Sequence, residues 1–152
     1  MPLVGIVIGS KSDLDSMKAT TDILDGLGAS YELSVISAHR TPEKAREYGL
    51  SAESRGIEVI LAAAGGSAAL PGVMSSWSIL PVIGIPLTSS DMNGVDSLYS
   101  IAQMPPGIPV ACVSIGSWGT RNAAYLAASI LSIKHPDIRD AYNQYRESLA
   151  SG

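Results

Sequence analysis

A histidine and an arginine stand side by side in the stretch Val35–Glu43 (VISAHRTPE), where an apolar segment meets the start of a helix. His39 is one of only two histidines, and imidazole is the side chain that exchanges protons near neutral pH without a perturbed pKa. Arg40 can hold a phosphate or a carboxylate through paired N–H donors. The alternative is a histidine that fills a turn beside a surface arginine. Their position after a predicted strand favours an active-site role for both residues.

The segment Gly9–Asp13 (GSKSD) follows the first apolar run of the chain. It combines a glycine, serine hydroxyls and the exposed backbone amides of a helix start, which together suit a phosphate or another anion. Asp13 would repel phosphate but could accept hydrogen bonds from sugar hydroxyls, so the combination predicts a ribose phosphate. The alternative is that Ser12 or Asp13 only caps the helix. The segment matches neither GxxxxGK[ST] nor GxGxxG, which disfavours a nucleoside triphosphate or a dinucleotide.

A third segment, Ala64–Gly72 (AGGSAALPG), carries almost no side-chain chemistry beyond the hydroxyl of Ser67. Its small residues would let a planar ligand approach the backbone and meet its amides. The alternative is close packing of a helix on a sheet, which small residues also favour.

Other polar and aromatic residues are predicted to have structural roles. Asp96 is expected to cap a helix, and Trp77 and Trp118 are expected in the core or at an interface. Cys112 lies in the middle of a predicted strand, which indicates a buried structural thiol. His135 lies in a polar turn and is expected to be solvated.

Strands and helices alternate along the chain, and the three segments above each follow a strand. The alternation predicts a single α/β domain over residues 1–152, a three-layer α/β/α sandwich with a central parallel sheet of the flavodoxin-like or Rossmann-like kind. Thr41 is expected as the N-cap of the second helix, with Pro42 at its first position. Ligands of such sheets bind at the carboxyl ends of the strands, so the three segments should meet at one edge. The predicted strands are Leu3–Ile8, Tyr31–Ile36, Ile57–Ala63, Val82–Ile85 and Val110–Ile115, and the predicted helices are Leu14–Leu27, Thr41–Gly56, Val73–Ser78, Asp96–Met104, Asn122–Ser132 and about 136–149.

Composition excludes several classes of protein. The net charge of −4 and the lack of a basic stripe argue against a nucleic-acid partner. The chain shows no apolar run of membrane-spanning length and no signal-peptide pattern, and its lone cysteine fits a reducing compartment, so we expect a cytoplasmic protein. Two widely separated histidines and no acidic cluster predict that no metal is bound.

Six segments, in order, resemble the class I N5-carboxyaminoimidazole ribonucleotide mutases of purine biosynthesis. They cover the chain from about Leu3 to Ile133 and read GSKSD, SAHRTP, GGSAALPG, LPVIGIP, GVDSLYSIAQMPPGIPV and NAAYLAA. The resemblance implies a homo-octamer, with the C-terminal helix packed on neighbouring subunits. It also implies transfer of a carboxylate from the exocyclic nitrogen of an aminoimidazole ribonucleotide to ring C4, through CO2 and without any cofactor.

The resemblance also implies roles for individual residues. His39 matches the general acid–base of the family, and the segments Ala64–Leu70 and Ser89–Gly94 are expected to close the site and retain CO2. The residues expected to bind the substrate are Ser10, Ser12, Asp13, Ser37, Arg40, Ala64, Gly65, Gly66, Ser67 and Leu70.

The third segment departs from the class I pattern. Class I mutases usually read GAGGAAHLPG there, whereas this chain reads AAAGGSAALPG, so Ala69 replaces a histidine expected to assist the site. Ser67 and the pair Ala69-Leu70 are similar to the AGRSNALSG of class II enzymes, which carboxylate aminoimidazole ribonucleotide directly with CO2. Three functions therefore stay open: the mutase, which the other segments favour, the direct carboxylase, and a ribonucleotide-binding module without activity.

Overall fold

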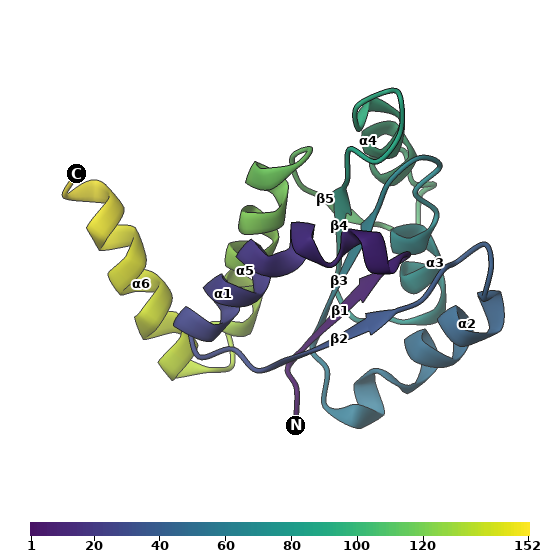
Figure 1. Cartoon of the computed structure of the whole chain (residues 1–152). Coiled ribbons are helices and arrows are strands. Elements are labelled where there is room, and N and C mark those ends of the chain that lie inside the picture. Colours follow the sequence, from purple (N-terminus) through teal and green to yellow (C-terminus); the bar gives the residue numbers. More distant parts are fainter.

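The computed structural model describes all residues from Met1 to Gly152 and has a five-stranded parallel sheet at its centre. The strands lie in the order β2-β1-β3-β4-β5, and every neighbouring pair runs parallel (Figure 1). The central strands β1, β3 and β4 are buried along their whole length, as expected for a sheet covered on both faces. The strands are β1 Val4–Ile8, β2 Tyr31–Val35, β3 Val59–Ala64, β4 Val82–Pro86 and β5 Ala111–Cys112.

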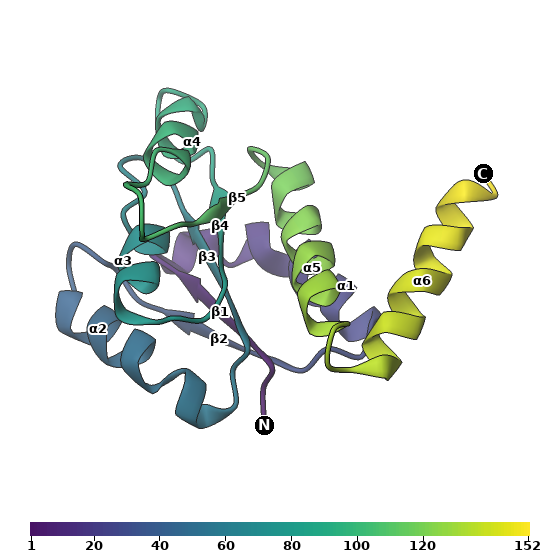
Figure 2. The same ribbon diagram turned by 180° about the vertical axis from the view of Figure 1, so that it is seen from behind.

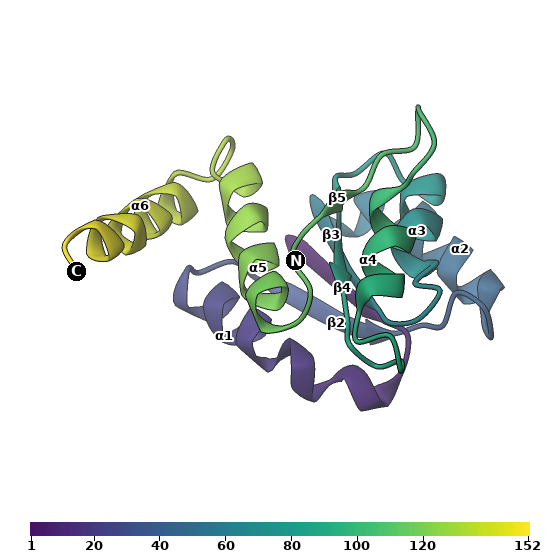
Figure 3. The same ribbon diagram turned by 90° about the horizontal axis from the view of Figure 1, so that it is seen from above.

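Helices cover both faces of the sheet. The helices α1 and α5 lie on one face, whereas α2, α3 and α4 lie on the other (Figures 1 and 3). The last helix, α6, packs against α5 and projects from the side of the domain (Figure 2). The helices are α1 Lys18–Gly26, α2 Pro42–Ser51, α3 Leu70–Trp77, α4 Val95–Ala102, α5 Ser117–Leu131 and α6 Pro136–Ala150, with short 3-10 turns η1 Lys11–Asp13, η2 Asp15–Met17 and η3 Glu53–Arg55. None of these helices combines the length and the apolar composition that a membrane crossing needs.

Each central strand contributes to two apolar cores because successive side chains point to opposite faces. Ile6, for example, packs in the core with α1 and α5, whereas its neighbour Val7 packs in the core with α2 and α3. The face of α5 that meets the sheet consists largely of alanines, which let the helix approach closely. The predicted three-layer α/β/α architecture with a parallel sheet is confirmed.

The boundaries of the last strand and of α5 differ from the prediction. A strand was expected over Val110–Ile115, but regular pairing ends at Cys112. The chain then turns at Gly116, whose φ is +71°, and α5 begins at Ser117 instead of at Asn122. Gly119 makes this early start possible, because a Cβ atom there would lie 1.6 Å from the Ser114 carbonyl oxygen.

Candidate active site

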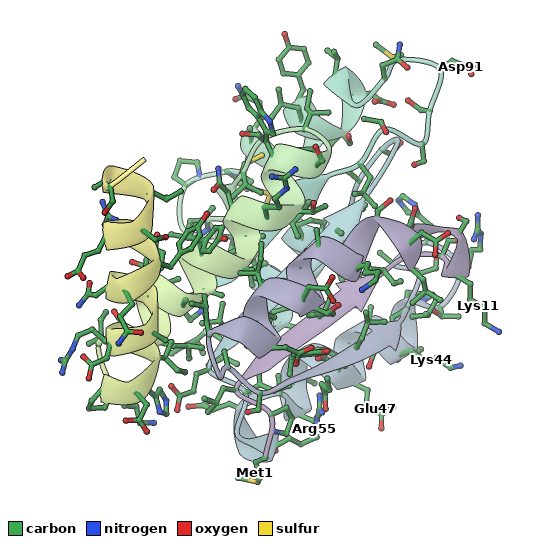
Figure 4. The ribbon with its side chains drawn as sticks, turned by 60° about the vertical axis from the view of Figure 1, so that its left-hand side comes forward. Met1, Lys11, Lys44, Glu47, Arg55 and Asp91 are labelled. Atoms are coloured by element: carbon green, nitrogen blue, oxygen red, sulfur yellow. The ribbon has the colours of Figure 1, made fainter.

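A cleft of about 430 Å³ opens at the carboxyl edge of the sheet, between the loops that follow β1, β2, β3 and β4. The three segments singled out in the sequence meet there, and every predicted site residue except Gly66 lies on its wall. The lining residues are Gly9, Ser10, Ser12, Asp13, Ser37, Ala38, His39, Arg40, Ala64, Gly65, Ser67, Ala68, Ala69, Leu70 and Ser89. Lys11 belongs to the same loops but points outward from the turn after β1 and does not line the cleft (Figure 4).

A larger hollow of about 680 Å³ lies at the opposite edge, near the amino ends of β4 and β5. Its wall is mostly apolar and includes Trp77, Ile79 and Ile108, with no titratable side chain. Acid–base chemistry therefore belongs to the smaller cleft, where an imidazole, a guanidinium and a carboxyl group meet.

The loop after β1 forms a tight turn around Ser10. The Oγ atom of Ser10 accepts a hydrogen bond from the Ser12 N–H at 3.3 Å and lies 2.9 Å from the Ser12 Oγ atom. Ser10 thus caps this turn, and the following helix α1 has Met17 at its N-cap without a side-chain bond, so the alternative in which Ser12 or Asp13 caps the helix is wrong. The Asp13 carboxylate forms no hydrogen bond within the chain, and partial burial raises its pKa. It is therefore free to accept hydrogen bonds from a ligand.

A hydrogen-bonded turn at Thr41 closes the loop after β2. The Thr41 Oγ atom donates to the Ser37 carbonyl oxygen at 2.9 Å and accepts from the Ser37 N–H at 3.2 Å. Thr41 occupies the N-cap position of α2 and Pro42 begins the helix, as predicted, but the Thr41 side chain bonds to Ser37 and not to the helix amides. The Ser37 Oγ atom in turn accepts from the Arg40 N–H at 3.1 Å. These bonds hold a turn that presents His39 and Arg40, whose side chains are exposed and bond to no other residue.

The loop after β3 offers backbone amides to the cleft. Between Gly65 and Leu70, only Ala68 donates its N–H within the chain, to the Gly65 carbonyl oxygen at 3.1 Å. Gly66 has a φ of +60° and Ala68 a φ of +33°, and the second value is strained for a residue with a side chain. Such turns gather unpaired N–H groups into concavities that bind anions, and α3 adds its N-terminus directly afterwards. The predicted use of this segment through its backbone fits this geometry.

Five lining residues were not among the predicted site residues: Gly9, Ala38, Ala68, Ala69 and Ser89. The first four are small neighbours of predicted residues. Ser89 stands out because it carries a hydroxyl and follows β4, and the rule that ligands bind after parallel strands could have identified it. In the sequence it was assigned only to a segment that closes the site.

The residues expected to have structural roles lie away from the cleft, but several predictions about them are wrong. His135 is only partly solvated: its side chain is 27% exposed, and its Nε2 atom lies 2.9 Å from the Glu58 carboxylate. Asp96 does not cap α4 but accepts a hydrogen bond from the Ser90 hydroxyl at 2.6 Å. Cys112 ends its strand and is half-buried instead of buried within it. Trp118 is 74% exposed, which leaves an interface as the predicted alternative to the core.

The fold and the cleft define a parallel α/β protein with a polar cleft at the carboxyl edge of the sheet. A family model described as AIR carboxylase matches residues 3–151, and the chain belongs to this family.

Similar proteins agree with this assignment. A protein of Pyrococcus abyssi named N5-carboxyaminoimidazole ribonucleotide mutase is 56% identical over 149 residues, which are 98% of this chain and 84% of that protein. A Thermotoga maritima protein of the same name is 53% identical over 98% of this chain and 86% of its own length. The crystal structure of Treponema denticola PurE has a TM-score of 0.86 and is 32% identical, covering 99% of this chain and 93% of that one.

Proposed function

We propose that this protein is an enzyme of purine biosynthesis that converts N5-carboxyaminoimidazole ribonucleotide into 4-carboxyaminoimidazole ribonucleotide. The observation that carries the proposal is a single cleft bounded by the side chains of His39 and Arg40, the turn Ser10–Asp13 and the free amides of Gly65–Leu70. The mutase name of relatives that are more than half identical to this chain supports the same reaction.

The cleft offers separate groups for each part of the nucleotide. Arg40 supplies the cationic donors for the phosphate, and the hydroxyls of Ser10, Ser12 and Ser37 lie on the same wall. The Asp13 carboxylate would accept hydrogen bonds from the ribose hydroxyls. The loop Ala64–Leu70 then faces the imidazole base, where its small residues allow the ring to approach the backbone.

His39 would carry the proton in both halves of the reaction. Loss of CO2 from the N-carboxylate leaves the exocyclic nitrogen in need of a proton, which a protonated imidazole can donate. Ring C4 then attacks the retained CO2, and the neutral imidazole removes the C4 proton, which restores the aromatic ring. The imidazole ends in its starting state, and neither a metal nor an organic cofactor is needed for these steps.

A direct CO2-dependent carboxylase is the second candidate, because Ala69 leaves the cleft wall without the second histidine of class I mutases. Serine and alanine cannot carry a proton at neutral pH, so the loop cannot restore that group. A binding module that lost its activity with this histidine is the third candidate.

Incubation of the pure protein with each possible substrate distinguishes the three. Turnover of the N-carboxylated ribonucleotide at low bicarbonate supports the mutase. Product formed only from aminoimidazole ribonucleotide at high bicarbonate supports the carboxylase. Thermal stabilisation by either ribonucleotide without any product supports the binding module.

We further infer a cytoplasmic homo-octamer in which residues 1–152 form one catalytic domain and α6 packs on neighbouring subunits. The isolated chain leaves His39 and Arg40 exposed, and a neighbouring copy would shield them from water. The side chain of Leu149 on α6 is 63% exposed, and α6 buries only Ile138, so the helix has an unpaired surface. The single cysteine and the net charge of −4 fit a cytoplasmic protein without a nucleic-acid partner.

A further inference from the structure

Ser89 places a hydroxyl directly over Gly65 on the wall of the cleft. A Cβ atom at Gly65 would lie 1.8 Å from the Ser89 Oγ atom and 3.1 Å from the Ser89 Cβ atom. The Oγ atom of Ser89 forms no hydrogen bond within the chain, although its neighbour Ser90 and the nearby Ser97 both do. Gly65 thus leaves room for a hydroxyl that has no partner in the protein and that faces the volume where a ligand would lie.

The loop that carries Ser89 is tied down on both sides of this residue. The buried Ser97 hydroxyl donates to the Leu87 carbonyl oxygen at 2.8 Å and to the Gly94 carbonyl oxygen at 3.0 Å. The Ser90 hydroxyl donates to the Asp96 carboxylate at 2.6 Å. Asp91 lies at the outer end of the loop (Figure 4), so these bonds leave the tip free and fix its base. The backbone that carries Ser89 is therefore anchored on both sides before a ligand binds, which lowers the entropy cost of a contact.

The order of the strands sets which part of the substrate Ser89 can reach. Arg40 follows β2 and Asp13 follows β1, at one end of the cleft, whereas Gly65 follows β3 and Ser89 follows β4, at the other. In the substrate of the proposed function, the carboxyl group lies on the exocyclic nitrogen of ring C5, and in the product it lies on C4. When the ribose phosphate occupies the end with Arg40, this side of the ring points toward the loops after β3 and β4.

We propose that Ser89 is a further substrate-contacting residue, whose hydroxyl donates a hydrogen bond to the migrating carboxyl group. This inference rests on the proposed function. One donor can serve the carboxyl group in both positions, because C5, which bears the exocyclic nitrogen, and C4 are adjacent atoms of the ring. The contact holds the carboxylate beside the free amides of Gly65–Leu70 and needs no proton transfer from serine, whose hydroxyl stays protonated at neutral pH.

Binding of two ribonucleotides to Ser89→Ala tests this role. Aminoimidazole ribonucleotide lacks the carboxyl group, and 4-carboxyaminoimidazole ribonucleotide carries it. We expect the variant to bind the carboxylated ligand about 10- to 100-fold more weakly, as for a lost hydrogen bond to a charged group, with an unchanged Kd for the other ligand. Isothermal titration calorimetry measures both Kd values. Equal Kd values of the variant and the wild type for the carboxylated ligand, or equal losses for both ligands, would overturn the proposal.

Thr88→Val is the matched control for this experiment. Thr88 lies in the same loop, but it lines a separate hollow with Gly116 and Ser117 and not the cleft, and valine keeps the methyl group that lies near Gly94. We expect the control to bind both ribonucleotides as the wild type does. Equal weakening of carboxylated-ligand binding in the control and in Ser89→Ala would point to the loop as a whole and contradict a specific contact.

A double-mutant cycle with Gly65→Ala tests the geometry. The added methyl group would displace the Ser89 hydroxyl, so Gly65→Ala should weaken binding of the carboxylated ligand much less when Ser89 is already alanine. Strict additivity would refute the contact. Turnover of N5-carboxyaminoimidazole ribonucleotide by the wild type tests the proposed function separately from the role of Ser89. Absence of turnover contradicts the proposed function. Normal turnover, together with unchanged binding of the carboxylated ligand by Ser89→Ala, contradicts only the role of Ser89.

Discussion

His39 is the only imidazole on the cleft, because Ala69 occupies the place of the second histidine. We expect His39→Asn to lower kcat by at least about 100-fold, which is typical of the loss of a general acid–base. The melting temperature should stay unchanged, because the His39 side chain is exposed and forms no bond within the chain. Steady-state kinetics and circular dichroism check both expectations. Near-normal turnover by a folded variant would exclude this role of His39.

The carboxyl group of Asp13, which we propose to bind the ribose, is expected to lower the stability of the fold. Burial raises the pKa of its carboxyl group, so ionisation is less favourable in the folded chain than in the unfolded chain. The folded state therefore loses stability as the pH rises through that pKa, and Asp13→Asn should melt above the wild type at pH 7. Below about pH 4 the wild-type carboxyl is protonated in both states and the difference should disappear.

Differential scanning fluorimetry over this pH range measures the effect of Asp13→Asn on stability, and kinetics measure its effect on binding. We expect the variant to raise KM, because an amide offers a single acceptor oxygen to the ribose hydroxyls. Greater stability of the wild type at pH 7 would contradict the inference that the carboxylate is held at a cost.

At the scale of elements, β1 and α2 fit together because Gly5 has no side chain. A Cβ atom at Gly5 would lie 2.3 Å from the Tyr48 hydroxyl oxygen and 3.0 Å from the Ile57 Cδ1 atom. We expect Gly5→Ala to lower the free energy of unfolding by about 1–3 kcal/mol, as overpacking does. The buried Tyr48 hydroxyl forms no hydrogen bond, so Tyr48→Phe alone should cost little and should recover part of the loss in the double variant. Urea unfolding measures all three variants, and full additivity would contradict this packing.

The order of the elements and the location of the cleft could be predicted from local patterns. Strands buried on both faces leave continuous apolar runs such as Val4–Ile8, and the parallel sheet then brings the loops after them to one edge. The hydrogen-bond partners of the Thr41 and Asp96 side chains could not be predicted in this way. Both residues are common helix caps, but their partners, Ser37 and Ser90, depend on how each loop folds back.

The same limit applied to His135 and to Ser89. The partner of His135 is Glu58, distant in the sequence, and only the packing of the turn between α5 and α6 beside β3 brings them together. The contact between Ser89 and Gly65 likewise joins two loops. A pattern within one segment carries no information about such pairs, so the position of the cleft could be predicted from the sequence but the contacts within it could not.

At the scale of the whole molecule, the chain exposes several large apolar side chains in addition to the cleft. Ile79 is 90% exposed and Trp77 is 39% exposed, and both border the hollow of about 680 Å³ at the edge of the sheet opposite the active site. Trp118 is 74% exposed near the start of α5. Apolar surface of this extent on a chain with a net charge of −4 is typical of an interface between subunits.

The hollow beside Ile79 provides a test of assembly. We expect multi-angle light scattering to give the wild type eight times the mass of the 15.8 kDa chain, and Ile79→Asp to give smaller species, because burial of an unpaired carboxylate opposes association. Ile79→Val keeps an apolar side chain and should assemble as the wild type does. A monomeric wild type, or an unchanged mass of Ile79→Asp, would contradict an interface on this face. Since His39 and Arg40 are exposed in the single chain, the smaller species should also lose turnover, which would link assembly to retention of CO2 in the cleft.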